Sequence, residues 1–181
     1  MDDLDPAFKP LVTAFLDALT AASATVQIAA TLRPPQRAYL MHYSWCIVKQ
    51  ALDPASIPAY QPQPTGPDPV DIQWLHTDAD GNPDLPASRA AAQQMVQAYG
   101  MTALNIAPAL ASRHITGQAI DMHIAWTGSL TIQDANGNTV VISSTPRDGT
   151  NPDLIKVGAT YGVIHLIVVE KDPPHWSTDG H

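Results

Sequence analysis

The sequence predicts an α+β fold, in which three to four helices flank a small antiparallel sheet and an extra β-hairpin is added. Apolar residues recur at helical spacing in the first half of the chain, whereas from Gly117 onward they alternate as they do in strands. The segment Ala135-Asn136-Gly137-Asn138 lies between two alternating runs and is typical of a hairpin turn. The 17 prolines and 10 glycines among 181 residues disfavour a helical bundle or a coiled coil.

The first two elements are a helix and a strand. Asp5-Pro6 resembles an N-cap followed by a proline in the first turn, and the apolar spacing after it predicts a helix that ends near Ala22. The residues over 25–32 alternate well enough for a strand. We expect this strand to end at Arg33-Pro34-Pro35, because proline has no backbone N–H to give to a sheet.

Two further helices follow, separated by irregular chain. Prolines that open a segment suit the start of a helix, so a second helix is expected from Pro35 to about Leu52. The segment 53–69 is rich in Pro, Gln, Gly and Ala, which indicates a surface loop too short to separate two domains. A short strand or turn over 70–76 and a turn-rich stretch then lead to a helix over 87–99, which Gly100 ends.

The second half predicts the sheet. We expect a strand over 118–126, the hairpin over 129–143, a short helix over 151–161 closed by Gly162, and a buried strand over 163–170. The sequence has no internal repeat, and its length is that of one domain. We therefore expect a single domain over residues 1–181.

Composition and charge exclude several classes of partner. Nine Lys and Arg against seventeen Asp and Glu give a net charge of −8, which opposes binding to nucleic acid or to an anionic membrane surface. No apolar run is long enough for a membrane span, so no membrane insertion is expected. The acidic start differs from the basic start of a secretory signal, which predicts synthesis in the cytoplasm without a signal peptide. The single cysteine, Cys46, lies among apolar residues and is expected to be an inert core thiol.

Two short segments carry residues of the metal-ligand type. In the first, His114 precedes Gly117 and then Asp121, a carboxylate within an otherwise apolar strand. Burying such a carboxylate is costly unless it is paired or bound to a metal. In the second, two prolines separate Asp172 from His175 and restrict the backbone between them.

His114, Asp121 and His175 together form a donor set that zinc accepts, and three protein ligands leave a fourth position for water. Asp172 lies three residues before a ligand and is the expected acceptor of a proton from that water. Simpler roles for the same residues remain open. His114 would then cap a loop, Asp121 would form a salt bridge with Arg113 or Arg147, and His175 would stack on Trp176.

The motif Ser112-x-His114-x-x-Gly117-x-Ala119-x-Asp121, with Asp172-x-x-His175-Trp176 near the carboxyl end, resembles the signature of the zinc peptidoglycan peptidases. This family includes D-alanyl-D-alanine carboxypeptidases and L-alanyl-D-glutamate endopeptidases, and it shares the hedgehog/DD-peptidase fold. The resemblance runs from about Phe8 to Trp176. The Pro-rich loop 53–69 and the hairpin 129–143 have no counterpart in its motifs.

The resemblance implies a role for each matching residue. His114, Asp121 and His175 would hold one zinc ion, and Asp172 would be the general base. The stretch from Thr31 to Gln36 resembles the family's strand-end arginine and the glutamine that follows it. Arg33 would then hold oxygens of the substrate or the transition state, and Gln36 would line the same site.

Four further residues are candidates for contacts with the substrate or with the ligands. Ser112 is expected to orient the loop around His114, since no nucleophile motif surrounds it. His123 shares a strand face with Asp121 and is either a partner of the site or a half-exposed histidine. His165 would reach the site from the last strand, and Trp176 follows the last ligand. Glu170 competes with Asp172 as the base, whereas the sequence around three other histidines indicates surface or loop positions: His42, His76 and His181.

The resemblance implies a zinc metallopeptidase that hydrolyses an amide bond in the stem peptides of bacterial peptidoglycan. An endopeptidase of the phage endolysin or secreted effector kind is expected, which would act on the cell wall after release by lysis or by secretion machinery. Two alternatives stay open, a D-alanyl-D-alanine carboxypeptidase and a non-catalytic zinc-bound recognition module. The sequence indicates no inhibitor or immunity protein.

Overall fold

The computed structural model of the protein describes residues 1–61, 69–167 and 172–181. The chain forms two compact units, one made of residues 1–33 and 112–181 and the other of residues 34–111. All of the expected metal ligands belong to the first unit. The single-domain organisation expected for residues 1–181 stays a prediction.

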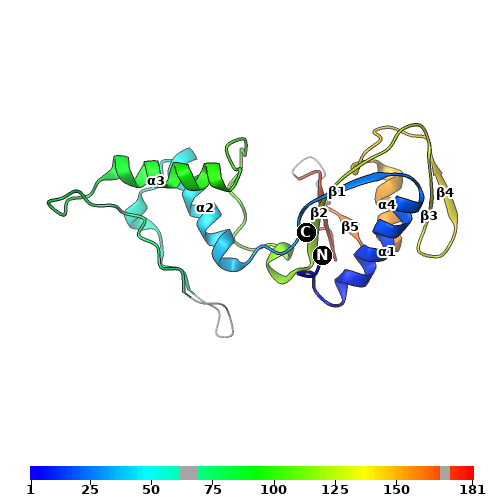
Figure 1. The fold of residues 1–181 in the computed structure, drawn as a ribbon, viewed down its shortest axis with the longest axis horizontal. Coiled ribbons are helices and arrows are strands. Elements are labelled where there is room, and N and C mark those ends of the chain that lie inside the picture. The colour runs from blue at the N-terminus through cyan, green and yellow to red at the C-terminus, as the bar shows by residue number, and fades with distance from the viewer. Residues whose placement is uncertain (62–68, 168–171) are drawn as a thin grey trace. The chain divides into compact units, whose positions relative to one another are not determined.

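A four-stranded antiparallel sheet lies at the centre of the first unit (Figure 1). Its strand order is β1-β2-β6-β5, so the second strand of the chain lies between the first and the last. The strands are β1 (Thr25–Ala30), β2 (Ala119–Ala125), β6 (His175–Ser177) and β5 (Ile164–His165). This order places the segment around residue 121 next to the segment around residue 175.

Two helices and a hairpin enclose the core of this unit. They are α1 (Phe8–Ala21), α4 (Pro152–Thr160) and the hairpin β3 (Leu130–Gln133) with β4 (Thr139–Ile142). Side chains alternate across β2, so that every second residue from Ile120 to Ile124 is buried in this core. The helices contribute the remaining large apolar groups, among them Phe8, Val12, Phe15, Leu19, Leu154 and Val157.

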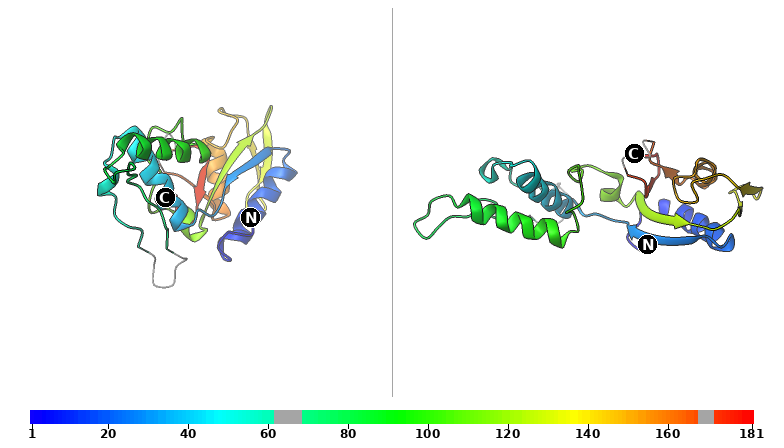
Figure 2. Two further views of the ribbon diagram at one scale, coloured as in Figure 1. Left: turned by 60° about the vertical axis from the view of Figure 1, so that its left-hand side comes forward. Right: turned by 90° about the horizontal axis from the view of Figure 1, so that it is seen from above.

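The second unit contains two antiparallel helices, α2 (Pro35–Lys49) and α3 (Leu85–Ala98), which lie side by side (Figure 2). Their direction follows from contacts at both ends. The Arg37 guanidinium lies over the Tyr99 ring, and Arg89 donates a hydrogen bond to the main-chain oxygen of Val48. A short 3₁₀ helix, η1 (Pro54–Ser56), lies in the loop expected over 53–69, of which residues 62–68 are outside the described part.

The expected α+β class is confirmed, with four α-helices, a small antiparallel sheet and a separate hairpin among the described residues. Some element bounds differ from the sequence prediction, and one strand was not predicted. Helix α2 ends at Lys49, and β1 ends at Ala30, where it still pairs with Asp121 after a register shift between Ile28 and Ala30. A short strand at 175–177 was not expected at all.

The last predicted strand, over 163–170, is wrong in its length and in its burial. Strand β5 pairs only through Ile164 and His165, since its partner β6 has only three residues. Ile167 is 65% exposed, so the apolar run leaves the core after His165. The remainder of the expected strand, 168–170, lies outside the described residues. Apolar composition alone does not reveal how much partner strand is available.

Candidate metal centre

Strand register brings two of the expected ligands together. Asp121 on β2 pairs directly with His175 on β6, and Ile120 pairs with Trp176. Because successive side chains on a strand point to opposite faces, the second pair enters the core and the first pair lies on the other face of the sheet. A register shift of one residue would break both pairs and leave Asp121 without His175 opposite it.

The third expected ligand is positioned by the turn before β2. Residues Arg113–Thr116 form a 3₁₀ helix, η2, and the Ser112 hydroxyl caps it by accepting a hydrogen bond from the His114 N–H. Gly117 ends the turn with φ of 70°, and a Cβ there would lie 2.8 Å from main-chain atoms of Asp3 and Asp5. The serine and the glycine of the motif therefore shape the loop that carries His114, as expected for Ser112.

The three candidate ligand atoms form a small triangle. His114 Nε2 lies 3.0 Å from Asp121 Oδ1 and 3.2 Å from His175 Nδ1, and the Asp121 Oδ1 to His175 Nδ1 distance is also 3.2 Å. The side chains of His114 and His175 are 2% and 6% exposed, and that of Asp121 is 13% exposed. A carboxylate and two imidazoles thus converge where little water reaches them.

Main-chain oxygens hold the other nitrogen of each imidazole. His114 Nδ1 contacts the main-chain oxygen of Thr31, and His175 Nε2 lies 3.2 Å from the main-chain oxygen of His181. A main-chain oxygen accepts hydrogen bonds and cannot donate them, so both of these nitrogens carry hydrogen. In the neutral imidazoles the lone pairs of His114 Nε2 and His175 Nδ1 therefore face each other and Asp121.

The electrostatics of the cluster follow from its burial and pairing. Burial by itself raises the pKa of Asp121, but hydrogen bonds and positive charge from His114 and His175 outweigh it and hold this pKa well below the usual range. Burial lowers the pKa of the His175 imidazole, and Asp121 reverses that effect, so that its pKa is raised above 6.5. The cluster therefore favours an ionised carboxylate and stabilises positive charge on the His175 imidazole.

The donor set and its spacing fit zinc. Zinc accepts imidazole nitrogen and carboxylate oxygen at about 2.0–2.1 Å, and the edges of such a tetrahedron are about 3.3 Å long. The three edges of the triangle, 3.0, 3.2 and 3.2 Å, are close to this value. Imidazole ligands of metals usually donate their second N–H to a carbonyl or a carboxylate, as both histidines do here.

Asp172 and Arg33 lie around this cluster without belonging to it. The His175 N–H donates to the main-chain oxygen of Asp172 at 3.0 Å, which closes a turn across the two prolines. Asp172 keeps contact with solvent, but partial burial and then the charge of Asp121 raise its pKa, while His175, His114 and Arg33 oppose the rise. The main-chain N–H of Arg33 donates to the main-chain oxygen of His114 at 3.0 Å, which ties the end of the β1 segment to the ligand loop.

His165 and Trp176 support the segment that carries Asp172 and His175. His165 is 2% exposed, and its Nε2 lies 2.7 Å from the main-chain oxygen of Pro173, within the segment that joins Asp172 to His175. Its ring meets Trp176 edge-on at 4.7 Å between centroids, and the Trp176 ring is fully buried against Phe15. These two side chains support the loop, and no contact of either with the three candidate ligands is found among the described residues.

Among the described residues, the remaining candidates are not part of the triangle of ligand atoms. His123 is exposed on the same strand face as Asp121 and is outside the triangle. Gln36 lies in the first turn of α2, in the second unit. Glu170, the alternative base, lies outside the described residues. Cys46 is buried, and this burial raises the pKa of its thiol, which agrees with an inert core position.

Two of the simpler roles for the ligand residues differ from the geometry. Arg113 pairs with Asp179 rather than with Asp121, and the ionic partners of Asp121 in the described part of the chain are His114 and His175. The ring that packs against Trp176 belongs to His165, whereas the ring of His175 packs edge-on against that of His114.

The sequence did not indicate the main-chain oxygens of Thr31 and His181. Every residue carries such an oxygen, so no side-chain pattern marks the two that bind the imidazoles. His181 was expected to be an unremarkable surface residue, and its side chain is indeed exposed while its main-chain oxygen contacts a candidate ligand.

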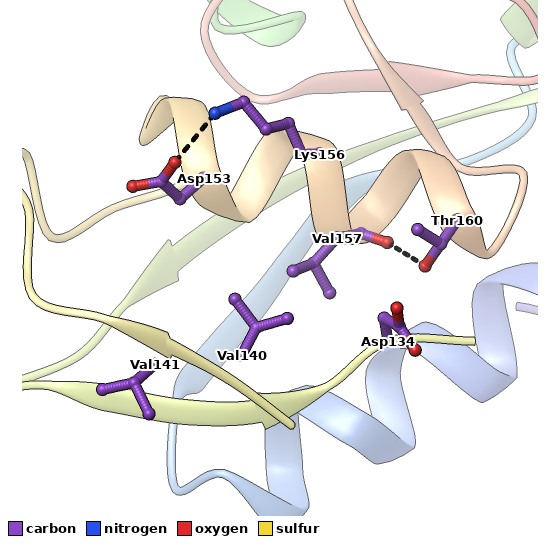
Figure 3. A pocket seen from close by; sticks show the side chains of 7 residues that line it. All are labelled: Asp134, Val140, Val141, Asp153, Lys156, Val157 and Thr160. Atoms are coloured by element: carbon purple, nitrogen blue, oxygen red, sulfur yellow. Dashed lines mark hydrogen bonds and ion pairs between the residues drawn. The ribbon is translucent and has the colours of Figure 1, made fainter. Parts of the chain in front are cut away.

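A separate hollow lies between α4 and the β3–β4 hairpin (Figure 3). Val140, Val141 and Val157 line it, and the Asp153–Lys156 ion pair lies at its edge. None of the expected site residues lines this hollow, and no group of convergent ligands does so among the described residues. The candidate ligands therefore lie outside this hollow.

Among the helices that the structure describes, none combines the length and the apolar character that crossing a bilayer requires. Comparisons of the chain with family models, with curated proteins and with solved structures find no match.

Proposed function

We propose that this protein is a zinc-dependent peptidase that hydrolyses an amide bond in the stem peptides of bacterial peptidoglycan, acting as an endopeptidase. The observation that carries the proposal is the triangle of His114, Asp121 and His175 with an acidic residue, Asp172, beside it. The substrate class is inferred from the motif resemblance, and the metal from the geometry of the donor atoms.

Each protein group has a task in this proposal. The three ligands would hold zinc, which when bound supplies a Lewis acid and lowers the pKa of a water molecule toward neutrality. Asp172 would accept a proton from the attacking water and return it to the leaving amine. Its raised pKa suits this exchange, because a base works best when its pKa approaches the working pH. The Arg33 guanidinium would stabilise the negative oxygen that develops on the scissile carbonyl.

The segment between Asp172 and His175 is held firmly enough for such a role. Hydrogen bonds from His165 Nε2 to the Pro173 oxygen, at 2.7 Å, and from the Met122 N–H to the Pro174 oxygen, at 2.8 Å, fix both proline carbonyls. Asp172 is thus tied to the strand that carries Asp121. A fixed base loses less freedom on reaching the transition state than a mobile one does.

The proposal also has a cellular part. The protein would be made in the cytoplasm without a signal peptide and would act on the cell wall after lysis or secretion machinery releases it. The net charge of −8 provides no long-range attraction to an anionic wall, so binding would depend on the surface around the metal. Nucleic acid and the membrane interior are not proposed as partners.

The test combines metal analysis with mass spectrometry of digested peptidoglycan. The protein is expected to contain about one zinc per chain and to release two peptide fragments from the stem peptides. Asp172→Asn should keep the metal and lower the rate of hydrolysis by about 10²–10⁴-fold, because it removes the proton acceptor and not a ligand. His114→Ala and Asp121→Ala should lose both the metal and the activity.

His123→Ala is the matched control, since it removes a histidine from the same strand face outside the triangle. Full turnover by Asp172→Asn would contradict the assignment of the base. Release of a terminal alanine alone would indicate a carboxypeptidase, and bound zinc without any cleavage would indicate a recognition module. A protein without affinity for zinc would refute the proposed function.

A further inference from the structure

The chain after β6 folds back onto one of the candidate ligands. The Ser177 hydroxyl accepts hydrogen bonds from the N–H groups of Gly180, at 2.9 Å, and His181, at 3.1 Å. Asp179 Oδ1 also accepts from the His181 N–H, at 3.3 Å. This turn, residues 177–181, brings the main-chain oxygen of His181 to 3.2 Å from His175 Nε2.

Arg113 fastens this turn to the loop that carries the other histidine ligand. Its Nε lies 3.0 Å from Asp179 Oδ2 and 3.2 Å from Oδ1, and its Nη2 also contacts Oδ2, so the guanidinium holds the carboxylate through two nitrogens. The Thr178 N–H donates to the main-chain oxygen of Gln118, at 3.1 Å, which is a second link to the same loop. The 177–181 turn and the His114 loop are therefore tied together at two points.

The solvent exposure of the Arg113–Asp179 ion pair indicates that it orients its neighbours more than it stabilises the fold. The side chains of Arg113 and Asp179 are 44% and 35% exposed, and exposed pairs add little to folding stability. A two-nitrogen contact with a carboxylate nevertheless restricts the orientation of both groups. Both restricted groups are close to a histidine ligand. Arg113 directly precedes His114. Asp179 accepts a hydrogen bond from the N–H of His181, whose main-chain oxygen contacts His175.

The orientation of the His181 oxygen decides which nitrogen of His175 is available. With hydrogen on Nε2, the neutral ring has its lone pair on Nδ1, which is the atom that faces Asp121 and His114. If the turn moved away, hydrogen would be free to occupy either nitrogen. A ring with hydrogen on Nδ1 cannot bind a cation at that atom.

We propose that Arg113 and Asp179 are positioning residues of the metal centre: their ion pair holds the 177–181 turn so that the His181 main-chain oxygen fixes the tautomer of His175. The proposal rests on the proposed function in one respect, namely that the cation is zinc. It assigns a role to the variable position between Ser112 and His114 of the motif. It also makes the segment after the last ligand part of the centre.

The test measures the tautomer and the zinc affinity separately, in Arg113→Gln and in Asp179→Asn. Long-range ¹H–¹⁵N spectra of the metal-free protein, at alkaline pH where the imidazole is neutral, report which nitrogen of His175 carries hydrogen. Wild type should show hydrogen on Nε2, and both variants should show a mixture. Zinc affinity, measured by competition with a chelator, should fall by about 10-fold or more in each variant.

The double variant should bind zinc no more weakly than the weaker single variant, because both changes break the same contact. Lys156→Gln is the matched control, since it removes an exposed ion pair of the first unit, with Asp153, that is not linked to the histidines. It should leave the tautomer and the affinity unchanged. Backbone amide spectra establish that each variant is folded.

The two proposals fail in different ways. If Arg113→Gln and Asp179→Asn keep hydrogen on Nε2 alone, as in the wild type, the positioning role is refuted whatever the metal does. If the wild type binds no zinc, the proposed function fails, and the tautomer spectra alone decide the role of Arg113 and Asp179. If zinc binds and the tautomer shifts while the affinity stays at the wild-type value, the positioning role is also refuted.

Discussion

At the scale of single residues, the cluster is defined by where its hydrogens and charges lie. Asp121 is ionised because two imidazoles face it, and His175 has a raised pKa because Asp121 faces it. In each imidazole, the nitrogen that faces away from Asp121 contacts a main-chain oxygen, so the protein itself fixes the orientation of the ring. The three side chains are thus oriented by the protein itself, with their candidate ligand atoms within 3.2 Å of one another.

Competition between a proton on His175 and zinc predicts how metal binding depends on pH. The pKa of His175 in the metal-free protein lies above 6.5, so at neutral pH a larger part of the molecules carries the extra proton than for an ordinary histidine. Zinc must displace it. We expect zinc affinity to fall about tenfold per pH unit as the pH drops below this raised pKa, and to level off above it.

Calorimetric titration with zinc in buffers of different ionisation enthalpy measures the protons released. Protons are expected to be released on zinc binding at neutral pH, because the extra proton of His175 must leave. A zinc affinity that stays constant from acidic to alkaline pH would contradict this competition. Lys156→Gln, which removes an exposed charge that pairs with Asp153 and with none of the three ligands, should show the same pH profile as the wild type.

At the scale of elements, the loop between residues 112 and 118 shows why a motif contains residues that touch no ligand. Ser112 caps the 3₁₀ turn, and Gly117 both adopts a positive φ and lies against the main chain of residues 3–5. The Asp5 N–H donates to the Gly117 oxygen at 2.9 Å, so the start of the chain closes over this loop. A motif glycine is required here for space as well as for conformation.

This double requirement predicts the effect of Gly117→Ala. A Cβ would clash with two main-chain atoms at 2.8 Å in addition to the cost of a left-handed alanine. We expect a loss of about 2 kcal/mol or more, and a fall of about 4–8 °C in Tm. Urea unfolding and thermal unfolding measure these changes.

Gly137→Ala in the β3–β4 turn is the matched control. Gly137 has φ of 81° and open space where a Cβ would lie, so only the conformational cost applies, about 1–2 kcal/mol. Equal losses for the two variants would show that the close approach of residues 3–5 contributes nothing. Zinc affinity should fall in Gly117→Ala and stay unchanged in Gly137→Ala.

At the scale of the whole molecule, the candidate ligands are all confined to one of the two compact units. They come from three elements, of which η2 and β2 are neighbours in sequence, whereas His175 on β6 lies 54 residues after Asp121. A ligand that binds the folded state stabilises it by about 2.7 kcal/mol when its concentration is 100 times Kd. Zinc should therefore strengthen the unit that contains these elements.

Hydrogen exchange with and without zinc tests this distribution. Zinc should slow amide exchange over residues 112–122 and 172–181, because both segments carry ligands. Peptides from α2 and α3 serve as an internal control in the same sample, since none of the three ligands belongs to the second unit. Equal slowing in both units would contradict a centre confined to the first, and the effect should disappear in Asp121→Ala.

Much of the fold could be predicted because its signals are local. The asparagine cap and proline at the start of α4, the prolines that open α2 and the Asn-Gly turn each depend on a few neighbouring residues. The fold class follows from them. The length of β5 could not be predicted, since it depends on the three residues that β6 offers as a partner.

The sequence by itself determined the residue types of the candidate site: His114, Asp121, His175 and Asp172 were all predicted from residue type and spacing. Only the tertiary structure decided how they meet. Strand register places Asp121 opposite His175, main-chain oxygens of Thr31 and His181 orient the imidazoles, and His165 supports the loop without reaching the ligands. The physical reason is that the sequence specifies the chemistry of each side chain directly. Strand pairing and main-chain hydrogen bonds instead join segments that are far apart in the chain, and they use backbone groups that no side-chain pattern marks.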